Sequence, residues 1–157
     1  MRRIEDSSNV DRTAKEVWEY VADPTTWPKW ASSYLELKQT STGPIALGAT
    51  FRSIHPKNRE LNESLVELDP ERSIAFEFTS GPIKGSRVSF RTRDVEGAGG
   101  RSQTQLTRVF DLKFSGLFKL LGPLLIAPGF RREGRTEVDR LKQLLEEQNS
   151  DPGTGQS

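Results

Sequence analysis

The stretch that decides the fold is LFKLLGPLLIAPGFRREGRTEVDRLKQLLEE, residues 117–147. Through its second half, small or apolar residues recur at the three- or four-residue spacing of a helix face: Phe130, Gly134, Val138, Leu141 and Leu145. Gly-Pro and Pro-Gly pairs at 122–123 and 128–129 predict an interruption before that half begins. We therefore expect a long C-terminal helix in two parts, with one apolar face that must pack against another element.

Strand patterns precede this helix and supply a partner for its apolar face. Alternating segments separated by Gly, Pro and Asp turns cover residues 34–40, 49–55, 60–68, 73–79, 86–95 and 102–112, and residues 2–11 add a polar first strand suited to a sheet edge. The connections are too short for parallel crossovers. The sequence predicts an α+β protein with a seven-stranded antiparallel sheet against a long C-terminal helix.

Two short helices are expected between the first and second strands. Thr13 and Glu16 have the spacing of a capping box, and Asp23-Pro24 marks the start of the second helix. These helices carry Trp18, Trp27 and Trp30. Such rings could stack on an aromatic ligand, but packing in the core is the better interpretation for Trp18 and Trp30.

Composition narrows the class of protein. The 157 residues suit one domain, which we place at 1–148, followed by a polar tail at 149–157 that we expect to be disordered. The net charge of +1 gives no broad electrostatic reason to bind nucleic acid, and the absence of cysteine excludes disulfides and thiolate chemistry. The N-terminus lacks the apolar run of a signal peptide, so we expect a cytoplasmic location.

The apolar run at 117–127 is too short to span a bilayer, which needs about 20 residues. Next to it lie Arg131, Arg132 and Arg135, and together they could make peripheral contact with an anionic membrane surface. A solvated outer face of the helix is the better interpretation. Nothing in the sequence indicates an oligomeric state.

A long helix laid across a curved sheet usually leaves space between the two layers, and we predict that this space holds a small hydrophobic molecule. Strand parity and helix phase predict its walls as Phe51, His55, Phe76, Phe78, Val88, Phe90, Leu106, Arg108, Phe110, Phe130, Gly134 and Val138.

Two of these side chains, Arg108 and His55, could bind a polar ligand group or transfer a proton. Arg108 shares a face with Leu106 and Phe110. It could meet a ligand carboxylate, phosphate or enolate, form an ion pair with Glu60 or Glu63, or be turned outward by a bulge. His55, the only histidine, could be a general base, although its place beside Pro56 at a turn favours exposure to solvent. One histidine and no cysteine make a zinc site improbable, and we expect no metal and no cofactor.

The strand at 60–68 fits two registers equally well. In one, Glu60, Asn62 and Ser64 face the cavity as polar anchors, and in the other Leu61 and Leu65 face inward. The pattern of the sequence does not choose between them.

Several segments resemble the polyketide cyclase/dehydrase-like branch of the START-like (SRPBCC) superfamily. They are Val17–Pro24, Trp27–Trp30, Gly48–Phe51, Glu67–Arg72 and Leu141–Glu146, and the resemblance covers about residues 3–147. It implies the helix-grip fold, in which the sheet grips the long helix around a cavity. Members include lipid carriers, aromatase/cyclases and coenzyme-Q-binding proteins. The family shares no catalytic motif, so the resemblance assigns no catalytic residue.

Three functions follow as hypotheses. The first is binding of a lipid, isoprenoid or aromatic polyketide-like molecule, and we lean towards a protein that is not an enzyme because few acid–base residues face the cavity. The second is a cyclase/dehydratase-type enzyme in which Arg108 stabilises an enolate and His55 or water moves protons. The third is an interaction module without a ligand.

Overall fold

The computed structural model describes the backbone of residues 2–116, 119–120 and 127–149, and the side chains of these residues except 127–134, 148 and 149. Seven antiparallel strands form one sheet in the order β1-β7-β6-β5-β4-β3-β2. They are β1 (Arg2–Val10), β2 (Glu36–Gln39), β3 (Thr50–His55), β4 (Arg59–Asp69), β5 (Ser73–Phe78), β6 (Arg87–Glu96) and β7 (Ser102–Leu112). The predicted sheet is confirmed, including the place of the first strand at its edge.

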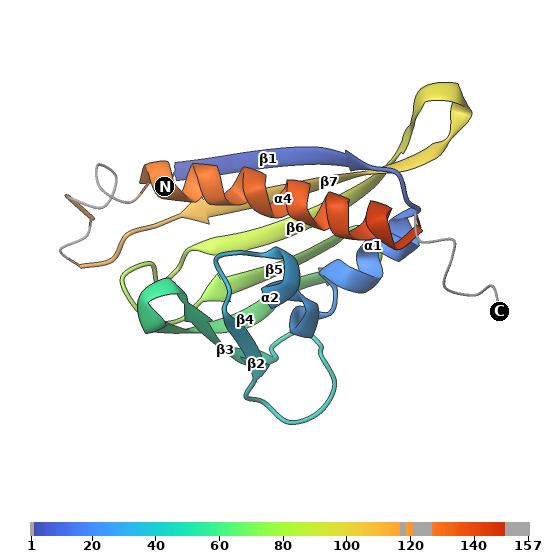
Figure 1. Cartoon of the computed structure of the whole chain (residues 1–157). Helices are drawn as coiled ribbons and strands as arrows, with labels where there is room; N and C mark the ends of the chain where they lie inside the picture. The colour runs from blue at the N-terminus through green and yellow to red at the C-terminus, as the bar shows by residue number, and fades with distance from the viewer. Residues whose placement is uncertain (1, 117–118, 121–126, 150–157) are drawn as a thin grey trace.

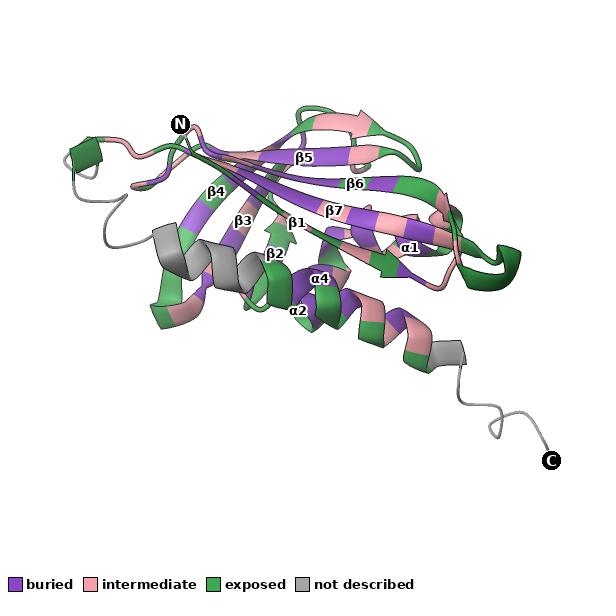
Figure 2. Cartoon of the chain, turned by 90° about the horizontal axis from the view of Figure 1, so that it is seen from above, coloured by how far each residue is buried: buried purple, intermediate pink, exposed green. Residues whose placement is uncertain are grey.

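The C-terminal helix α4 (Ala127–Asn149) lies across one face of the sheet, alongside β1 and β7 (Figure 1). Its buried side chains Val138, Leu141 and Leu145 face the sheet, while its other side is exposed (Figure 2). The second half of the predicted helix is therefore confirmed, but Pro128 and Gly129 lie in the first turn of α4 and do not interrupt the helix before it. The path predicted for 117–126 falls largely outside the described residues, as does the tail from 150 to 157.

Short helices cover the rest of that face: α1 (Ala14–Val21), η1 (Pro24–Thr26) and α2 (Trp27–Trp30). The predicted capping box is present, with Thr13 and Glu16 each bonding to the other's backbone N–H. Asp23 caps η1 by accepting from the Thr25 N–H at 3.1 Å. Among the described residues, 3₁₀ turns are also found at η2 (Pro56–Asn58) and η3 (Ala98–Gly100).

Trp27 is the centre of an aromatic core beneath these helices. Its ring centroid lies 4.9 Å from that of Phe76 and 5.1 Å from that of Phe90, both in edge-to-face geometry. Tyr34 and Trp30 contact the same ring at 5.2 Å and 5.7 Å. The indole N–H donates to the Val21 carbonyl, so the buried ring leaves no polar atom unpaired. Trp27 and Trp30 are fully buried and Trp18 is half-buried against the core.

Strand β4 adopts the register in which Leu61 and Leu65 face inward. Asn62 is exposed, so the alternative with Asn62 as a polar anchor is wrong. Between Leu65 and Glu67 the pairing with β5 shifts by one residue, which leaves Val66 40% exposed on the outside. This register also carries Glu63 into the interior, where it is 1% exposed.

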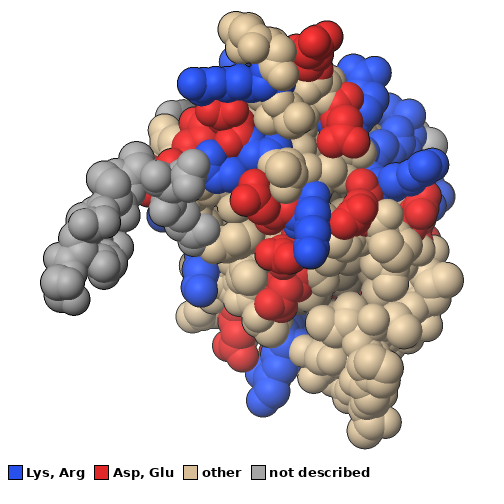
Figure 3. All heavy atoms as spheres, turned by 90° about the vertical axis from the view of Figure 1, so that its right-hand side faces the viewer, with Lys and Arg blue, Asp and Glu red and all other residues tan. Residues whose placement is uncertain are grey.

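Two further observations concern the surface. Leu35, which precedes β2, is 55% exposed, whereas Leu37 within β2 is buried. Basic and acidic side chains are interspersed over the face in Figure 3. Arg3 of β1 forms an ion pair with Asp111 of β7 at 2.8 Å. Among the described helices, none has the length and apolarity that crossing a membrane requires.

We predict that Trp27→Ala lowers the free energy of unfolding by about 3–5 kcal/mol, because it removes the ring on which four other aromatic side chains pack. Urea unfolding followed by circular dichroism measures this loss. Trp18→Ala is the matched control, because loss of the half-buried Trp18 ring should lower the free energy of unfolding by distinctly less. Equal losses for the two variants would contradict the central role of Trp27.

Candidate functional site

A cavity of about 220 Å³ lies between the inner face of the sheet and the segment that follows α2. The loop after α2, the turn from β3 to β4, the connection from β5 to β6, and β6 and β7 all contribute to it. Its described lining residues are Ser33, Tyr34, His55, Arg59, Glu60, Leu61, Phe78, Gly81, Pro82, Ile83, Val88, Arg108 and Phe110. The lining is mostly apolar, with polar groups at a few positions, as is usual for a small-molecule site.

Five of the predicted wall residues line this cavity: His55, Phe78, Val88, Arg108 and Phe110. Five others are buried but are not among its described lining residues: Phe51, Phe76, Phe90, Leu106 and Val138. The aromatic rings among them pack on one another and on Trp27, so α2 fills the part of the interior that we had assigned to a ligand. The side chain of Phe130 and the surroundings of Gly134 lie outside the described residues.

Sequence reasoning missed the loop residues of the lining. Ser33 and Tyr34 follow α2, and Gly81, Pro82 and Ile83 connect β5 to β6. Periodicity cannot assign an inward direction to loop positions, because they follow neither the strand nor the helix repeat. The sequence indicates a turn at Gly81-Pro82, but only the three-dimensional fold places this turn beside the cavity.

Arg108 forms a buried ion pair with Glu137 of α4. Its Nε atom lies 3.0 Å from Oε2 of Glu137, and the two side chains are 4% and 1% exposed. The expected ion-pair partners Glu60 and Glu63 are therefore wrong, because α4 packs along β1 and β7 and supplies a carboxylate of its own. The guanidinium also lies 5.4 Å from the ring centroid of Phe110. The contact between Nε and Oε2 is an ion pair without hydrogen-bond geometry, since Nε, Nη1 and Oε2 of Glu137 are all buried without a hydrogen-bond partner among the described residues.

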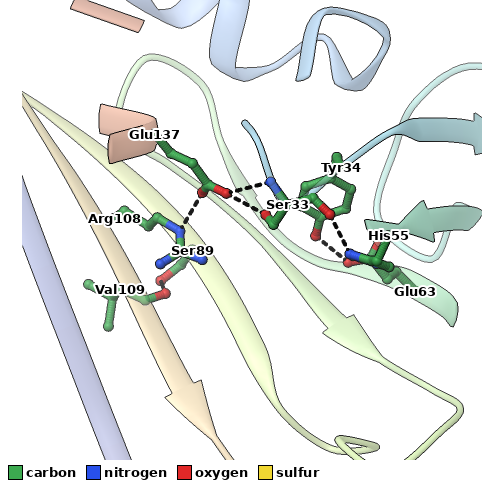
Figure 4. Close-up of polar contacts among 8 residues, drawn as sticks. All are labelled: Ser33, Tyr34, His55, Glu63, Ser89, Arg108, Val109 and Glu137. Carbon is green, nitrogen blue, oxygen red and sulfur yellow. Dashed lines mark hydrogen bonds and ion pairs between the residues drawn. The ribbon is translucent and has the colours of Figure 1, made fainter. Parts of the chain in front are cut away.

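Glu137 ties three elements together (Figure 4). Its second oxygen, Oε1, accepts from the Ser33 N–H at 3.1 Å and from the Ser33 hydroxyl. One carboxylate thus joins α4 to β7 and to the loop after α2. Glu137 precedes Leu141 by one helical turn, a spacing that could have placed it on the buried face from sequence.

His55 is 8% exposed, so the expectation of an exposed side chain is wrong. Its Nδ1 lies 2.6 Å from the Ser33 carbonyl oxygen, which can only accept, so Nδ1 carries a proton. Nε2 lies 2.8 Å from the Ser53 hydroxyl. Burial lowers the pKa of His55, against the opposing hydrogen bond to Ser33. The imidazole is then neutral near pH 7, and Nε2 accepts from Ser53.

Glu63 is a second buried acid, next to the cavity wall. The Tyr34 hydroxyl donates to its Oε1 at 2.6 Å, while Oε2 has no hydrogen-bond partner. Burial raises the pKa of Glu63 to about 7, although the hydrogen bond from Tyr34 opposes the shift. Burial is also the main reason that the pKa of Tyr34 is raised well above its usual value. Glu63 can therefore exchange a proton near neutral pH, and Tyr34 stands between it and the cavity.

Within the described part of the chain, no three His, Asp or Glu side chains are grouped so that they could hold a metal ion. The polar groups of the site are instead two connected sets. One runs from Arg108 through Glu137 and Ser33 to His55 and Ser53, and the other joins Tyr34 to Glu63. Such an arrangement can bind a polar group and hold a proton without a metal.

The family profile described as Polyketide cyclase / dehydrase and lipid transport matches residues 1–146. Because the match covers almost the whole chain, the protein belongs to this family, which confirms the family resemblance and the helix-grip fold. A comparison with functionally curated proteins found no match.

Solved structures share the fold at low sequence identity. XoxI from Bacillus cereus is 13% identical with a TM-score of 0.71, and the alignment covers 95% of this chain and 99% of XoxI. The Aha1 dimer from Colwellia psychrerythraea is 14% identical with a TM-score of 0.65, covering 93% of this chain and 97% of that one. The di-domain ARO/CYC protein BexL, from the BE-7585A biosynthetic pathway, is 20% identical with a TM-score of 0.70, covering 97% of this chain and 48% of BexL. At these identities the likeness establishes the fold alone.

The raised pKa of Glu63 predicts a pH-dependent stability. In the unfolded chain this acid has its ordinary pKa of 4.5, so between pH 4.5 and about 7 the folded protein holds a proton that the unfolded chain has lost. The contribution of Glu63 to stability is thus fully present below pH 4.5 and falls by about 3 kcal/mol as the pH rises to 7. Glu63→Gln, which cannot ionise, should lack this fall.

Urea unfolding of both proteins from pH 4.5 to 7.5 measures the difference. The gap between Glu63→Gln and the parent should widen with pH, and because His55 is present in both, its own titration largely cancels. Glu60→Gln, at an exposed position on the same strand, is the control and should track the parent. A gap that stays constant with pH would rule out the raised pKa.

The buried ion pair predicts a strong coupling between its two residues. Arg108→Met leaves Glu137 with an uncompensated buried charge and should cost about 3–5 kcal/mol of stability. Arg108→Met/Glu137→Gln removes both charges while keeping an oxygen for Ser33, so it should recover a large part of that loss. A double-mutant cycle of unfolding free energies tests this, and additive losses would show that the two side chains do not interact.

Proposed function

We propose that the protein binds a small, mostly apolar molecule in the cavity beside Arg108. The observation that carries the proposal is the cavity itself, whose walls include the apolar side chains of Leu61, Phe78, Val88 and Phe110. Burying the apolar surface of a ligand against these side chains would supply the driving force, at about 25 cal/mol per Å² before the cost of association.

The volume of the cavity suggests the size of the ligand. An apolar cavity of about 150 Å³ is enough to bind benzene. The described cavity of about 220 Å³ suits a molecule with one or two rings, or a group of that size at the end of a longer lipid or isoprenoid. Membership in a family described by polyketide cyclase, dehydrase and lipid transport functions agrees with a ligand of this kind.

A cyclase/dehydratase-type activity in the same cavity is the second candidate. It is favoured by Glu63, whose pKa of about 7 suits a residue that gives and takes protons at neutral pH. The similarity to the ARO/CYC protein BexL points the same way. Loss of turnover in Glu63→Gln with ligand binding intact would support this candidate over binding alone.

The binding proposal predicts that Val88→Phe abolishes ligand retention. Val88 lines the cavity and is 1% exposed, so a larger ring there occupies the space of the ligand. Native mass spectrometry of protein purified from its own host measures a retained small molecule directly. Val66→Phe makes the same change at the exposed bulge of β4 and should keep the ligand.

Ethylbenzene titrated into the protein provides a second measurement, with chemical shift changes at the backbone amides of the cavity as the readout. Shifts in the parent and in Val66→Phe, absent in Val88→Phe, support the proposal. No retained molecule together with no shifts in the parent would refute it.

A further inference from the structure

We infer that the free edge of β2 pairs in antiparallel fashion with the same edge of a second copy of this chain, about a twofold axis at Leu37. The pairing joins the two seven-stranded sheets into one. None of the described residues that line the cavity belongs to β2, so this interface is separate from the proposed ligand site. Three features of the edge favour the pairing: its place at the end of the sheet, the direction of its backbone groups and the pattern of its charges.

The strand β2 lies at one end of the sheet, and β1 lies at the other. The two edges differ in their surroundings. The long helix α4 packs along β1, whereas the main contacts of β2 outside the sheet are with the short η1 and α2 (Figure 1). An edge strand presents a row of backbone N–H and C=O groups to which another strand can bind. In the part of the chain that the structure describes, β2 is thus the edge that is more open to a partner strand.

The backbone of β2 limits how a second copy can pair with it. The Thr40 N–H donates to the Thr50 carbonyl, on the side of β3, at 2.8 Å. Because the backbone groups of a strand point alternately to its two sides, the even-numbered residues bond to β3, and the groups of Leu37 and Gln39 point to the open side. A second copy must therefore set odd-numbered residues opposite odd-numbered ones. Two such registers pair three of the four strand residues, with the twofold axis at Leu37 or at Lys38.

The exposed charges of β2 distinguish these two registers. Glu36 and Lys38 are both exposed, on the face opposite to the buried Leu37. An axis at Lys38 places the ammonium groups of the two copies directly opposite each other, which is unfavourable. An axis at Leu37 instead places Glu36 of each copy opposite Lys38 of the other, in two complementary pairs. Within its own chain Glu36 makes an exposed contact with Arg52 at 4.0 Å, which water weakens. The segment 36–38 is therefore complementary to itself in one register.

Two exposed leucines flank β2 in the sequence and add apolar surface to this edge. Leu35 is 55% exposed and Leu47 is 63% exposed. Leu47 belongs to a stretch without charged residues, 39–51. With the axis at Leu37, Leu35 of each copy lies opposite Gln39 of the other, where that uncharged stretch begins. Contact between them removes apolar surface from water without bringing a charge with it, which favours association of two identical copies.

Reversal of one charge tests the pairing. Lys38→Glu and Glu36→Lys each place like charges opposite each other in two places, so each should raise the dissociation constant of the dimer at least about tenfold. Both side chains are exposed, so both variants should fold. Sedimentation velocity from about 10 µM to about 1 mM measures the constant, because dimer formation follows mass action. Lys84→Glu changes an exposed lysine between β5 and β6 and should match the parent. A parent that stays monomeric would overturn the second copy as the partner, and a dimer that neither reversal weakens would overturn the register.

A mixture of the two reversals gives a sharper test. Equal amounts of Lys38→Glu and Glu36→Lys restore both complementary pairs between unlike copies, so the mixture should dimerise to within about threefold of the parent although each variant alone dimerises weakly. In the parent, hydrogen exchange at the Leu37 amide should slow with protein concentration, while exchange at the Lys38 amide, which bonds to β3 in either state, should not change. A mixture that associates no better than its components, or a dimer in which Leu37 exchanges as fast as in the monomer, would contradict the pairing.

Discussion

The ion pair between Arg108 and Glu137 is the constraint on which the arrangement of the interior depends. Both side chains are almost fully buried, and each belongs to a different layer, β7 in the sheet and α4 above it. Burying either charge alone would cost several kcal/mol, so the helix and the sheet must lie where the two groups can meet. Because Glu137 also accepts two hydrogen bonds from Ser33, the loop after α2 is held to the same point.

This point of attachment lies between two differently packed parts of the interior. On the side of α1 and α2, Trp27 and the rings around it fill the space between the layers, with edge-to-face contacts of about 5 Å. Towards the connection from β5 to β6 the rings of Phe78 and Phe110 form part of the wall, with their centroids 6.2 Å apart, and the cavity remains beside them. The short helices are therefore what limits the cavity, since a wider gap would exist if α2 did not carry two tryptophans.

Much of the fold could be predicted from the sequence, because period-two strands, Gly and Pro turns and a helical apolar face all indicated the same architecture. The inward direction of Arg108 followed from strand parity alone. The register of β4 could not be predicted, because the correct register places the charged Glu63 inside, which the hydrophobic pattern opposes. The predicted exposure of His55 was wrong for a related reason. Its place beside a turn suggested contact with solvent, but the Ser33 carbonyl and the Ser53 hydroxyl form hydrogen bonds with both ring nitrogens inside the protein.

Buried ionisable groups usually reduce stability relative to apolar side chains of the same size. The site buries four charged or titratable side chains, and their presence calls for a functional explanation: His55, Glu63, Arg108 and Glu137. A structural role explains the presence of Arg108 and Glu137, since their contacts join β7, α4 and the loop after α2. It does not account for Glu63, whose second oxygen has no hydrogen-bond partner and whose proton is held only weakly near pH 7. Glu63 is thus the residue whose presence the fold explains least, and its contact with Tyr34, which lines the cavity, makes proton exchange with a bound molecule the property that most needs to be measured.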